Sequence, residues 1–404
     1  MVVVQFGRYL RWFRRPQLRF SPEMVMYRYV VGISLLLALL AGCSEKKDSG
    51  ALQQLPLDLA AGKELAQKNC AACHGMDGRG VKDNIPNLAA QVEAYLLKAI
   101  KTYDHGKRAA SSGDAMEVAQ KLTPDKLRNV LGYYAGLPPL SNPGKGGASY
   151  SYYERGEELS KPCFRCHGAD GNPAEAGLPR LAGQHPQYII KATKAYQDGT
   201  RTMPTMHEKL TGLTQSDLEH IAIYFALNKP KPVASKAANP YAGKMYANSC
   251  TKCHGSMGSS EDVSIPNLAG QDVKYLKTII KAYRDNVREH GVMHQAMTGI
   301  KDSEIEKIAI FFASEQPAQI AFVPPEPVDA LAQKCDLCHN LGSANPDMLT
   351  PKLAGQNRTY LINAMTAYRD GDRGSSAMHS MTTLLYFDAS IEAIAAHYSV
   401  QPAK

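Results

Sequence analysis

One short pattern, repeated four times, constrains this chain more than any other feature. Two cysteines stand three positions apart with a histidine directly behind them, first in "CAACHG" and then in "CFRCHG", "CTKCHG" and "CDLCHN". Eight of the nine cysteines belong to these pairs, and a disulfide framework rarely gives every pair one spacing with a histidine after it. The copies are Cys70–Cys73–His74, Cys163–Cys166–His167, Cys250–Cys253–His254 and Cys335–Cys338–His339.

The repeat extends well beyond the cysteines, which indicates four copies of one module of about eighty residues. Counted from each histidine, a proline follows after 12 residues, a glutamine after 17, and tyrosines after 21 and 29. The prolines open the related stretches "PNLAAQ", "PRLAGQ", "PNLAGQ" and "PKLAGQ". In chain order, the prolines are Pro86, Pro179, Pro266 and Pro351, the glutamines are Gln91, Gln184, Gln271 and Gln356, and the tyrosines are Tyr95, Tyr188, Tyr275 and Tyr360, then Tyr103, Tyr196, Tyr283 and Tyr368.

The modules are predicted to be all-α. Segments such as "LTQSDLEHIAIYFA" place apolar residues at helical spacing behind a polar start that can cap a helix, and no stretch alternates convincingly as a strand. Stretches such as "PPLSNPGKGGAS" separate the modules, because proline and glycine do not continue a helix. We therefore expect four tandem helical domains, over residues 59–140, 150–230, 238–317 and 327–402.

Three kinds of site use paired cysteines at this spacing. A zinc site needs four ligands, and each module offers two cysteines and one histidine, crowded together. A thioredoxin-like motif expects a βαβ pattern, which the sequence lacks. The third kind is the attachment of c-type haem, in which both thiols bond to the macrocycle and the histidine ligates the iron. Four matches in register favour this third kind, so we expect four covalent haem c groups, each with His74, His167, His254 or His339 as an iron ligand.

Methionines at a matched offset are candidates for the second iron ligand. In modules 2 to 4 a methionine stands 39 residues after the histidine, whereas the first module has only Met116, at 42 residues. Core methionines that fill gaps are common, and bis-histidine ligation is an alternative because a histidine follows each matched methionine. The matched methionines are Met206, Met293 and Met378, the methionines near them are Met203, Met297 and Met381, and the histidines are His207, His294 and His379.

These motifs together resemble the class I c-type cytochromes, and most of all the two-haem cytochrome c4 family. The resemblance rests on "CAACHG" with its proline stretch, on "YRDG" and on the methionine loop, and it covers residues 59–400 as two such proteins in series. It implies Met/His haems and electron transfer with redox protein donors and acceptors, not enzyme catalysis. It also implies that the carbonyl group of each repeated proline orients the ligating histidine, since such histidines usually donate their other ring N–H to a carbonyl.

Three departures from that family keep alternatives open. The fourth module has "CHN" for "CHG", the first has Ala90 where the others have glycine, and Met116 is out of register. A haem with an open coordination position in the first module would make the chain an enzyme. A subunit of a larger oxidoreductase complex is a further alternative. Arginines after the second tyrosine would pair with haem propionates or remain solvated: Arg108, Arg201, Arg288 and Arg373.

The N-terminal region has the pattern of an export signal. Arg28 precedes a run of thirteen residues, Val30 to Gly42, too short to span a bilayer as a helix. The ending "LLAGC" resembles a bacterial lipobox, which implies cleavage after residues 1–42 and acylation of Cys43. Residues 43–58 are the expected tether, and Ser44 suggests outer-membrane sorting in the periplasm by the same resemblance.

Net charge gives no reason to expect a nucleic-acid partner. The formal charge of +8 includes six arginines and one glutamate in the first 42 residues. The remainder carries 40 basic and 37 acidic side chains, which is close to balance. A basic surface that attracts nucleic acid is therefore not predicted.

Overall fold

Helices make up all the regular structure that the described residues contain, with no β-strand among them, and the all-α prediction is confirmed. The computed structural model describes residues 56–104, 117–119, 121–140, 150–232, 239–340 and 349–402. Leu57–Lys404 form one compact unit; of the other unit, Met1–Pro56, only Pro56 is among the described residues. Met116, Arg108 and Cys43 therefore lie outside the described part of the chain.

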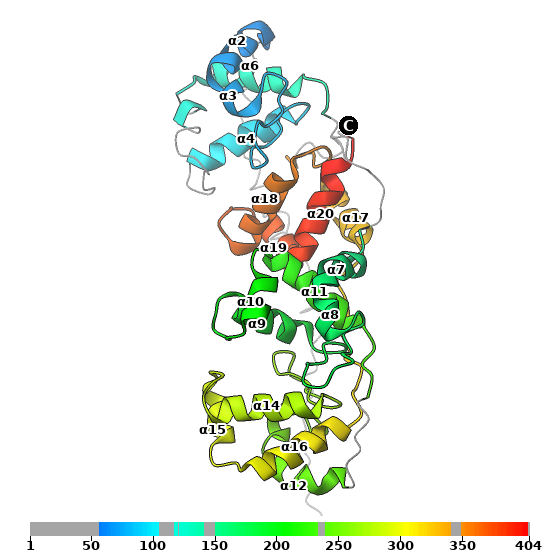
Figure 1. Cartoon of the computed structure of the whole chain (residues 1–404). Coiled ribbons are helices and arrows are strands. Elements are labelled where there is room, and N and C mark those ends of the chain that lie inside the picture. The colour runs from blue at the N-terminus through cyan, green and yellow to red at the C-terminus, as the bar shows by residue number, and fades with distance from the viewer. Residues whose placement is uncertain are drawn as a thin grey trace, which may run out of the picture. The chain divides into compact units, whose positions relative to one another are not determined.

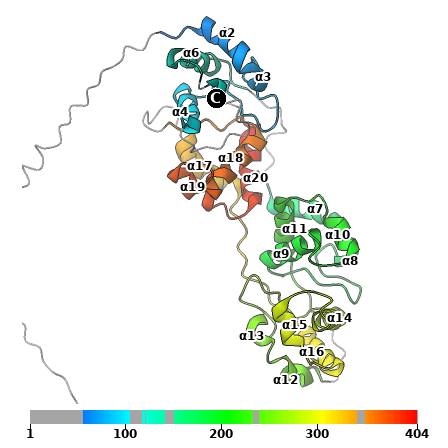
Figure 2. The same cartoon turned by 90° about the vertical axis from the view of Figure 1, so that its left-hand side faces the viewer.

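Each module repeats one order of helices (Figures 1 and 2). A helix precedes or contains the cysteine pair, a long middle helix follows the "LAGQ" turn, and a last helix closes the module. Module 1 has α2 (Leu59–Asn69), α3 (Ala71–His74), α4 (Glu93–Asp104) and α6 (Pro124–Ala135). Module 2 has α7 (Tyr152–Ser160), η1 (Lys161–Cys163), α8 (Phe164–His167), α9 (Pro186–Gln197), α10 (Pro204–Leu210) and α11 (Gln215–Leu227). Module 3 has η2 (Pro240–Gly243), α12 (Lys244–Ala247), α13 (Thr251–His254), α14 (Val273–Arg284), α15 (Gly291–Met297) and α16 (Asp302–Ser314), and module 4 has α17 (Val328–His339), α18 (Arg358–Asp370), α19 (Ser376–Thr383) and α20 (Asp388–Val400).

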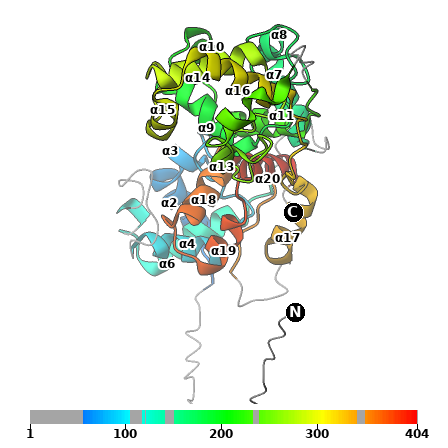
Figure 3. The same ribbon diagram turned by 90° about the horizontal axis from the view of Figure 1, so that it is seen from below.

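The first and last helices of modules 1 to 3 cross at a glycine. A Cβ atom on Gly156 in α7 would overlap the carbonyl oxygen of His220 in α11. Gly62 meets Asn129 in the same way, where α2 crosses α6, and Gly243 meets Lys307 of α16. Figure 3 shows α2, α4 and α6 of module 1 grouped together. Backbone contact of this kind brings the cysteine-bearing segment against the core formed by the last helix.

Local sequence accounts for where the helices begin. Thr214 and Asp217 form a capping box at the start of α11, and Asp272 and Asn357 cap α14 and α18 with their side chains. Helix α11 is buried without interruption from Leu218 to Ala226. A helix that is buried on all its faces has packing partners on every side, and α11 contacts α7 and α9 of its own module and α20 of module 4.

Candidate haem-attachment sites

The cysteine pairs of modules 1 to 3 lie at a short helical turn, and the pair of module 4 lies in the last turns of α17. The first cysteine of each pair is half-buried and packs against a core cluster together with the leucine of the "LAGQ" turn, as Cys163 does with Leu181 and Cys250 with Leu268. The second cysteine is exposed in modules 2 to 4. Burial raises the pKa of Cys70 to about 11, so its thiol is protonated at neutral pH. All eight are free thiols, available for covalent attachment.

Each histidine of the pattern is oriented through a hydrogen bond to a proline carbonyl oxygen twelve residues on. The Nδ1–O distances are 3.0 Å for His74 and Pro86, 3.0 Å for His167 and Pro179, 2.9 Å for His254 and Pro266, and 2.8 Å for His339 and Pro351. A carbonyl oxygen accepts, so Nδ1 carries the proton and Nε2 has its lone pair free for a metal. Burial lowers the pKa of all four rings, and the hydrogen bond opposes that only in part. The neutral, ligating form is therefore favoured.

The residue after the histidine explains the departure of module 4. Gly75, Gly168 and Gly255 have φ angles of 63°, 78° and 82°, and a Cβ on Gly168 would lie 2.5 Å from the carbonyl oxygen of Asn172. These turns need glycine. Asn340 instead has φ −107°, at the end of a continuous α17, so module 4 leaves its histidine by a different turn and needs no glycine there.

The matched methionines share one structural position. Met206, Met293 and Met378 are each the third residue of a short helix, α10, α15 or α19, and each is half-buried. Among their neighbours, Met203 and Met381 are exposed and Met297 is buried in the core of module 3. The histidine after each matched methionine donates from Nδ1 to the second repeated tyrosine's carbonyl oxygen. These pairs are His207 with Tyr196 (2.9 Å), His294 with Tyr283 (2.9 Å) and His379 with Tyr368 (2.8 Å).

Several observations test whether these residues fit a haem. The half-buried cysteines and leucines provide an apolar wall, as a macrocycle requires. Arg288 is only 9% exposed, yet its Nε and Nη1 have no hydrogen-bond partner. A buried guanidinium with orphaned donors fits a carboxylate such as a propionate. The donor set of thiols, imidazole and thioether is the set that c-type haem uses.

Two other kinds of feature do not occur among the described residues. No helix there is long and apolar enough to cross a membrane. No group of three or more His, Cys, Asp or Glu side chains in those segments is placed to hold a metal ion.

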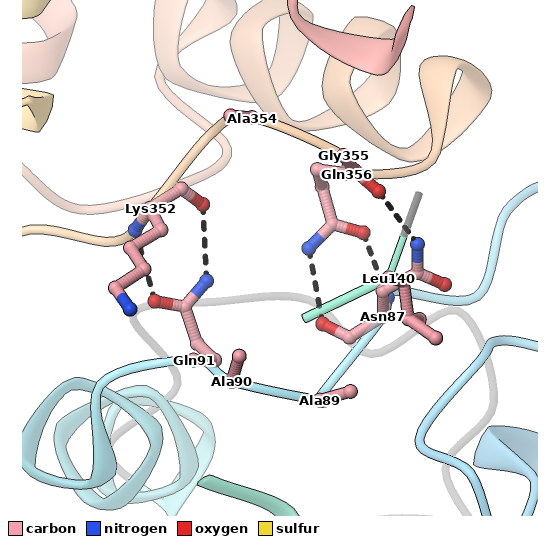
Figure 4. Close-up of a pocket in the computed structure, with 9 residues that line it drawn as sticks. All are labelled: Asn87, Ala89, Ala90, Gln91, Leu140, Lys352, Ala354, Gly355 and Gln356. Atoms are coloured by element: carbon pink, nitrogen blue, oxygen red, sulfur yellow. Dashed lines mark hydrogen bonds between the residues drawn. The ribbon is translucent and has the colours of Figure 1, made fainter. Parts of the chain in front are cut away.

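The role of the four repeated glutamines was not predicted from the sequence. Gln356 accepts from the amide of Asn87 (2.7 Å) and donates to its carbonyl oxygen (3.0 Å), and Gln91 makes the same exchange with Lys352 (2.9 and 3.0 Å; Figure 4). These bonds join residues of module 1 to residues of module 4. The sequence signal for this role was the recurrence of a glutamine at the same position in all four modules, because no haem ligand is expected at that position.

Comparison with known proteins gives one family. The cytochrome c family matches residues 59–133, 153–225 and 242–315, more than half of the chain. Cytochrome c4 of Pseudomonas aeruginosa is 31% identical over 170 residues, which cover 39% of this chain and 85% of that protein. A protein of Thiomonas intermedia named thiosulfate dehydrogenase electron acceptor is 29% identical over 38% of this chain and 78% of its own length. The crystal structure of reduced cytochrome c4 from Pseudomonas stutzeri is 25% identical and is covered over 100% of its chain by 42% of this one, with a TM-score of 0.39.

Proposed function

Because this chain belongs to the class I cytochrome c family, as a multihaem electron carrier like cytochrome c4, we propose that it relays electrons in the periplasm between respiratory donors and acceptors. One haem in each of the four modules and a lipid on Cys43 that holds the protein at the outer membrane are parts of this proposal. The observation that carries it is the fourfold repetition of one geometry, a free cysteine pair beside a histidine oriented by a proline carbonyl oxygen. The name of the Thiomonas relative supports a dehydrogenase as one class of donor.

Cysteine, histidine and methionine side chains would each have a separate role at the haem. Haem iron supplies one-electron chemistry between its ferrous and ferric states. The cysteine pairs would hold the group, and His74, His167, His254 and His339 would supply Nε2 as iron ligands. Met206, Met293 and Met378, on the matching short helices, would supply thioether sulfurs as further iron ligands. The last helix of each module packs core residues beside the first cysteine, and this packing would limit the access of water to the group.

A spectroelectrochemical titration of the purified mature protein tests the proposal. We expect four haems per chain and four reversible one-electron steps, with no high-spin ferric signal. A high-spin ferric haem that binds small molecules would contradict the carrier function and favour an enzyme. Fewer than four haems per chain would contradict the assignment of one haem to each module.

Matched methionine variants test the second iron ligand. We expect Met206→Ala to lower the potential of one haem markedly, because the axial ligand is a main determinant of haem potentials, which span about 0.8 V. Met203→Ala, a change at the exposed N-cap of α10, should leave all four potentials unchanged. If the Met203 variant produces the shift and the Met206 variant does not, the ligand assignment is wrong.

A further inference from the structure

Reciprocal hydrogen bonds join module 2 to module 3 and module 1 to module 4. These pairs are nested, because modules 2 and 3 lie between modules 1 and 4 in the sequence. Between modules 2 and 3, Gln271 accepts from the amide of Arg180 (2.8 Å) and donates to its carbonyl oxygen (3.1 Å). Gln184 makes the same exchange with Asn267 (2.8 and 3.1 Å). The bonds of Gln91 and Gln356 described above repeat this pattern between modules 1 and 4. One interface therefore occurs twice, within an inner pair (modules 2 and 3) and an outer pair (modules 1 and 4).

Arginine and tyrosine side chains mark the same two pairs. Arg373 of module 4 lies 4.4 Å from the ring centroid of its own Tyr368 and donates to the hydroxyl oxygen of Tyr95 in module 1 (3.2 Å). In the inner pair, Arg288 lies 5.1 Å from the ring centroid of Tyr283. It interacts electrostatically with Tyr188 and Tyr196 of module 2. The guanidinium with orphaned donors therefore lies where modules 2 and 3 meet.

A third contact connects the two pairs. The buried carboxylate of Glu219 in α11 accepts from the amide of Ala389 in α20 (2.8 Å), and Tyr152 donates to Ser390 (3.4 Å). Ile223 and Tyr152 of module 2 belong to the hydrophobic core cluster of module 4. The modules are therefore in contact in the order 1–4–2–3.

The path of the segment between modules 3 and 4 agrees with this order of contacts. Gln319 donates to the carbonyl oxygen of Ala226 at the end of α11 in module 2 (3.2 Å). Phe322 then packs edge-on against Phe387, the N-cap of α20 (ring centroids 6.5 Å apart). The chain thus passes along module 2 on its way from module 3 to module 4.

We propose that the four modules work as two nested dihaem pairs, in which module 1 is redox-coupled to module 4 and module 2 to module 3. The repeated glutamines are positioning residues that hold each pair together. This rests on the proposed electron-carrier function and adds the pairing, which the order of the sequence does not contain. Consecutive modules 1 and 2, or 3 and 4, would then change oxidation state without a direct effect of one on the other.

Single glutamine variants of the full-length holoprotein distinguish nested from consecutive pairing without any assignment of potentials to haems. Gln271→Leu lies in module 3 and Gln356→Leu in module 4. Nested pairing predicts that each variant shifts two of the four midpoint potentials, that the two sets do not overlap, and that the double variant shifts all four. Gln91→Leu should shift the same two potentials as Gln356→Leu. Gln67→Leu, on the exposed face of α2, is the control and should shift none.

Hydrogen exchange gives a second readout that does not depend on electron transfer. In Gln356→Leu the amide of Asn87 should lose protection, while the amide of Asn267 keeps it; Gln271→Leu should expose Arg180 and spare Asn87. Shifts of the same two potentials by Gln271→Leu and Gln356→Leu would overturn the proposal, as would unchanged potentials and protection in both. A high-spin, ligand-binding haem with nested shifts intact would instead contradict the carrier function and leave the pairing standing.

Discussion

At the residue scale, two substitutions in the repeat account for a difference between the two interfaces. In the inner pair, Arg180 donates to the carbonyl oxygens of Gly270 (2.5 Å) and Ala269 (2.6 Å), and a Cβ on Gly270 would lie 2.7 Å from Nη1. In the outer pair the corresponding residues are Lys352 and Ala90, and a cavity of about 20 Å³ remains there, enough for one water molecule. Ala90 leaves no room for an arginine at position 352.

We expect substitutions at Ala90 and Lys352 to be strongly coupled in their effects on thermal stability. Ala90 has φ 55°, in the left-handed region, which costs an L-residue about 1–2 kcal/mol. Ala90→Gly should therefore raise the midpoint of thermal unfolding slightly, after the entropy that glycine gains in the unfolded chain is subtracted.

Lys352→Arg should destabilise the protein when Ala90 is present and stabilise it in the Ala90→Gly background. A double-mutant cycle of thermal unfolding should show a coupling energy of about 1 kcal/mol or more. Equal effects of Lys352→Arg in both backgrounds would show that the Cβ of Ala90 does not exclude the guanidinium.

At the scale of the elements, the crossing of the first and last helices is a close backbone contact. Gly156→Ala forces a methyl group into the backbone of α11, and overpacking of this kind costs about 1–3 kcal/mol. Gly291→Ala is the matched control, because nothing lies within 4 Å of its Cβ position at the start of α15. We expect a lower thermal midpoint for the first variant and an unchanged or higher one for the second. Similar losses in both would contradict close packing at Gly156.

A backbone amide in the first turn of α20 donates to the carboxylate of Glu219 in module 2. This contact predicts that the stability of the fold depends on pH. Burial raises the pKa of Glu219, and its hydrogen bonds with Gln215 (2.7 Å) and the amide of Ala389 oppose this only in part. Since the folded-state pKa lies above the unfolded value, the folded state binds the proton more tightly. Below the unfolded-state pKa, the buried carboxyl group of Glu219 costs no stability. The free energy of unfolding falls as pH rises through that value and then through the folded-state pKa.

Glu219→Gln should therefore remove this fall in thermal midpoint as pH rises above the ordinary pKa of a glutamate, about 4. The amide can still accept from Ala389 and can donate to Gln215 Oε1, which has no partner. Glu219→Ala should instead lose the cap of α20, about 1 kcal/mol, at every pH. An unchanged pH profile in the glutamine variant would mean that Glu219 does not titrate with folding.

How far the sequence determined this structure depends on the range of each interaction. The cysteine turns, the helices and the histidine–proline geometry involve residues within one module, so periodicity and spacing predicted their existence. Asn340, the C-cap of α17, stands where the other modules have glycine, and its effect on the backbone there was not predicted. The contact of Asn87 with Gln356 joins residues 269 positions apart, and a repeated glutamine does not by itself reveal which copy it pairs with. The face of α11 that packs against α20 could not be predicted for the same reason, because the sequence of a mostly apolar helix does not indicate which other helix packs against it.

At the scale of the whole molecule, the proposed function includes a lipid on Cys43 that would hold the chain at the membrane. Acylation with several chains gives firm anchoring, whereas one chain binds only marginally. Cys43→Ser should therefore release the holoprotein into the soluble periplasmic fraction, with no incorporation of labelled fatty acid and with all haem potentials unchanged. Ser44→Asp should keep the label but move the protein from the outer to the inner membrane fraction. An unlabelled wild-type chain would contradict the lipid anchor, and an unchanged distribution of the Ser44 variant would contradict sorting by that residue.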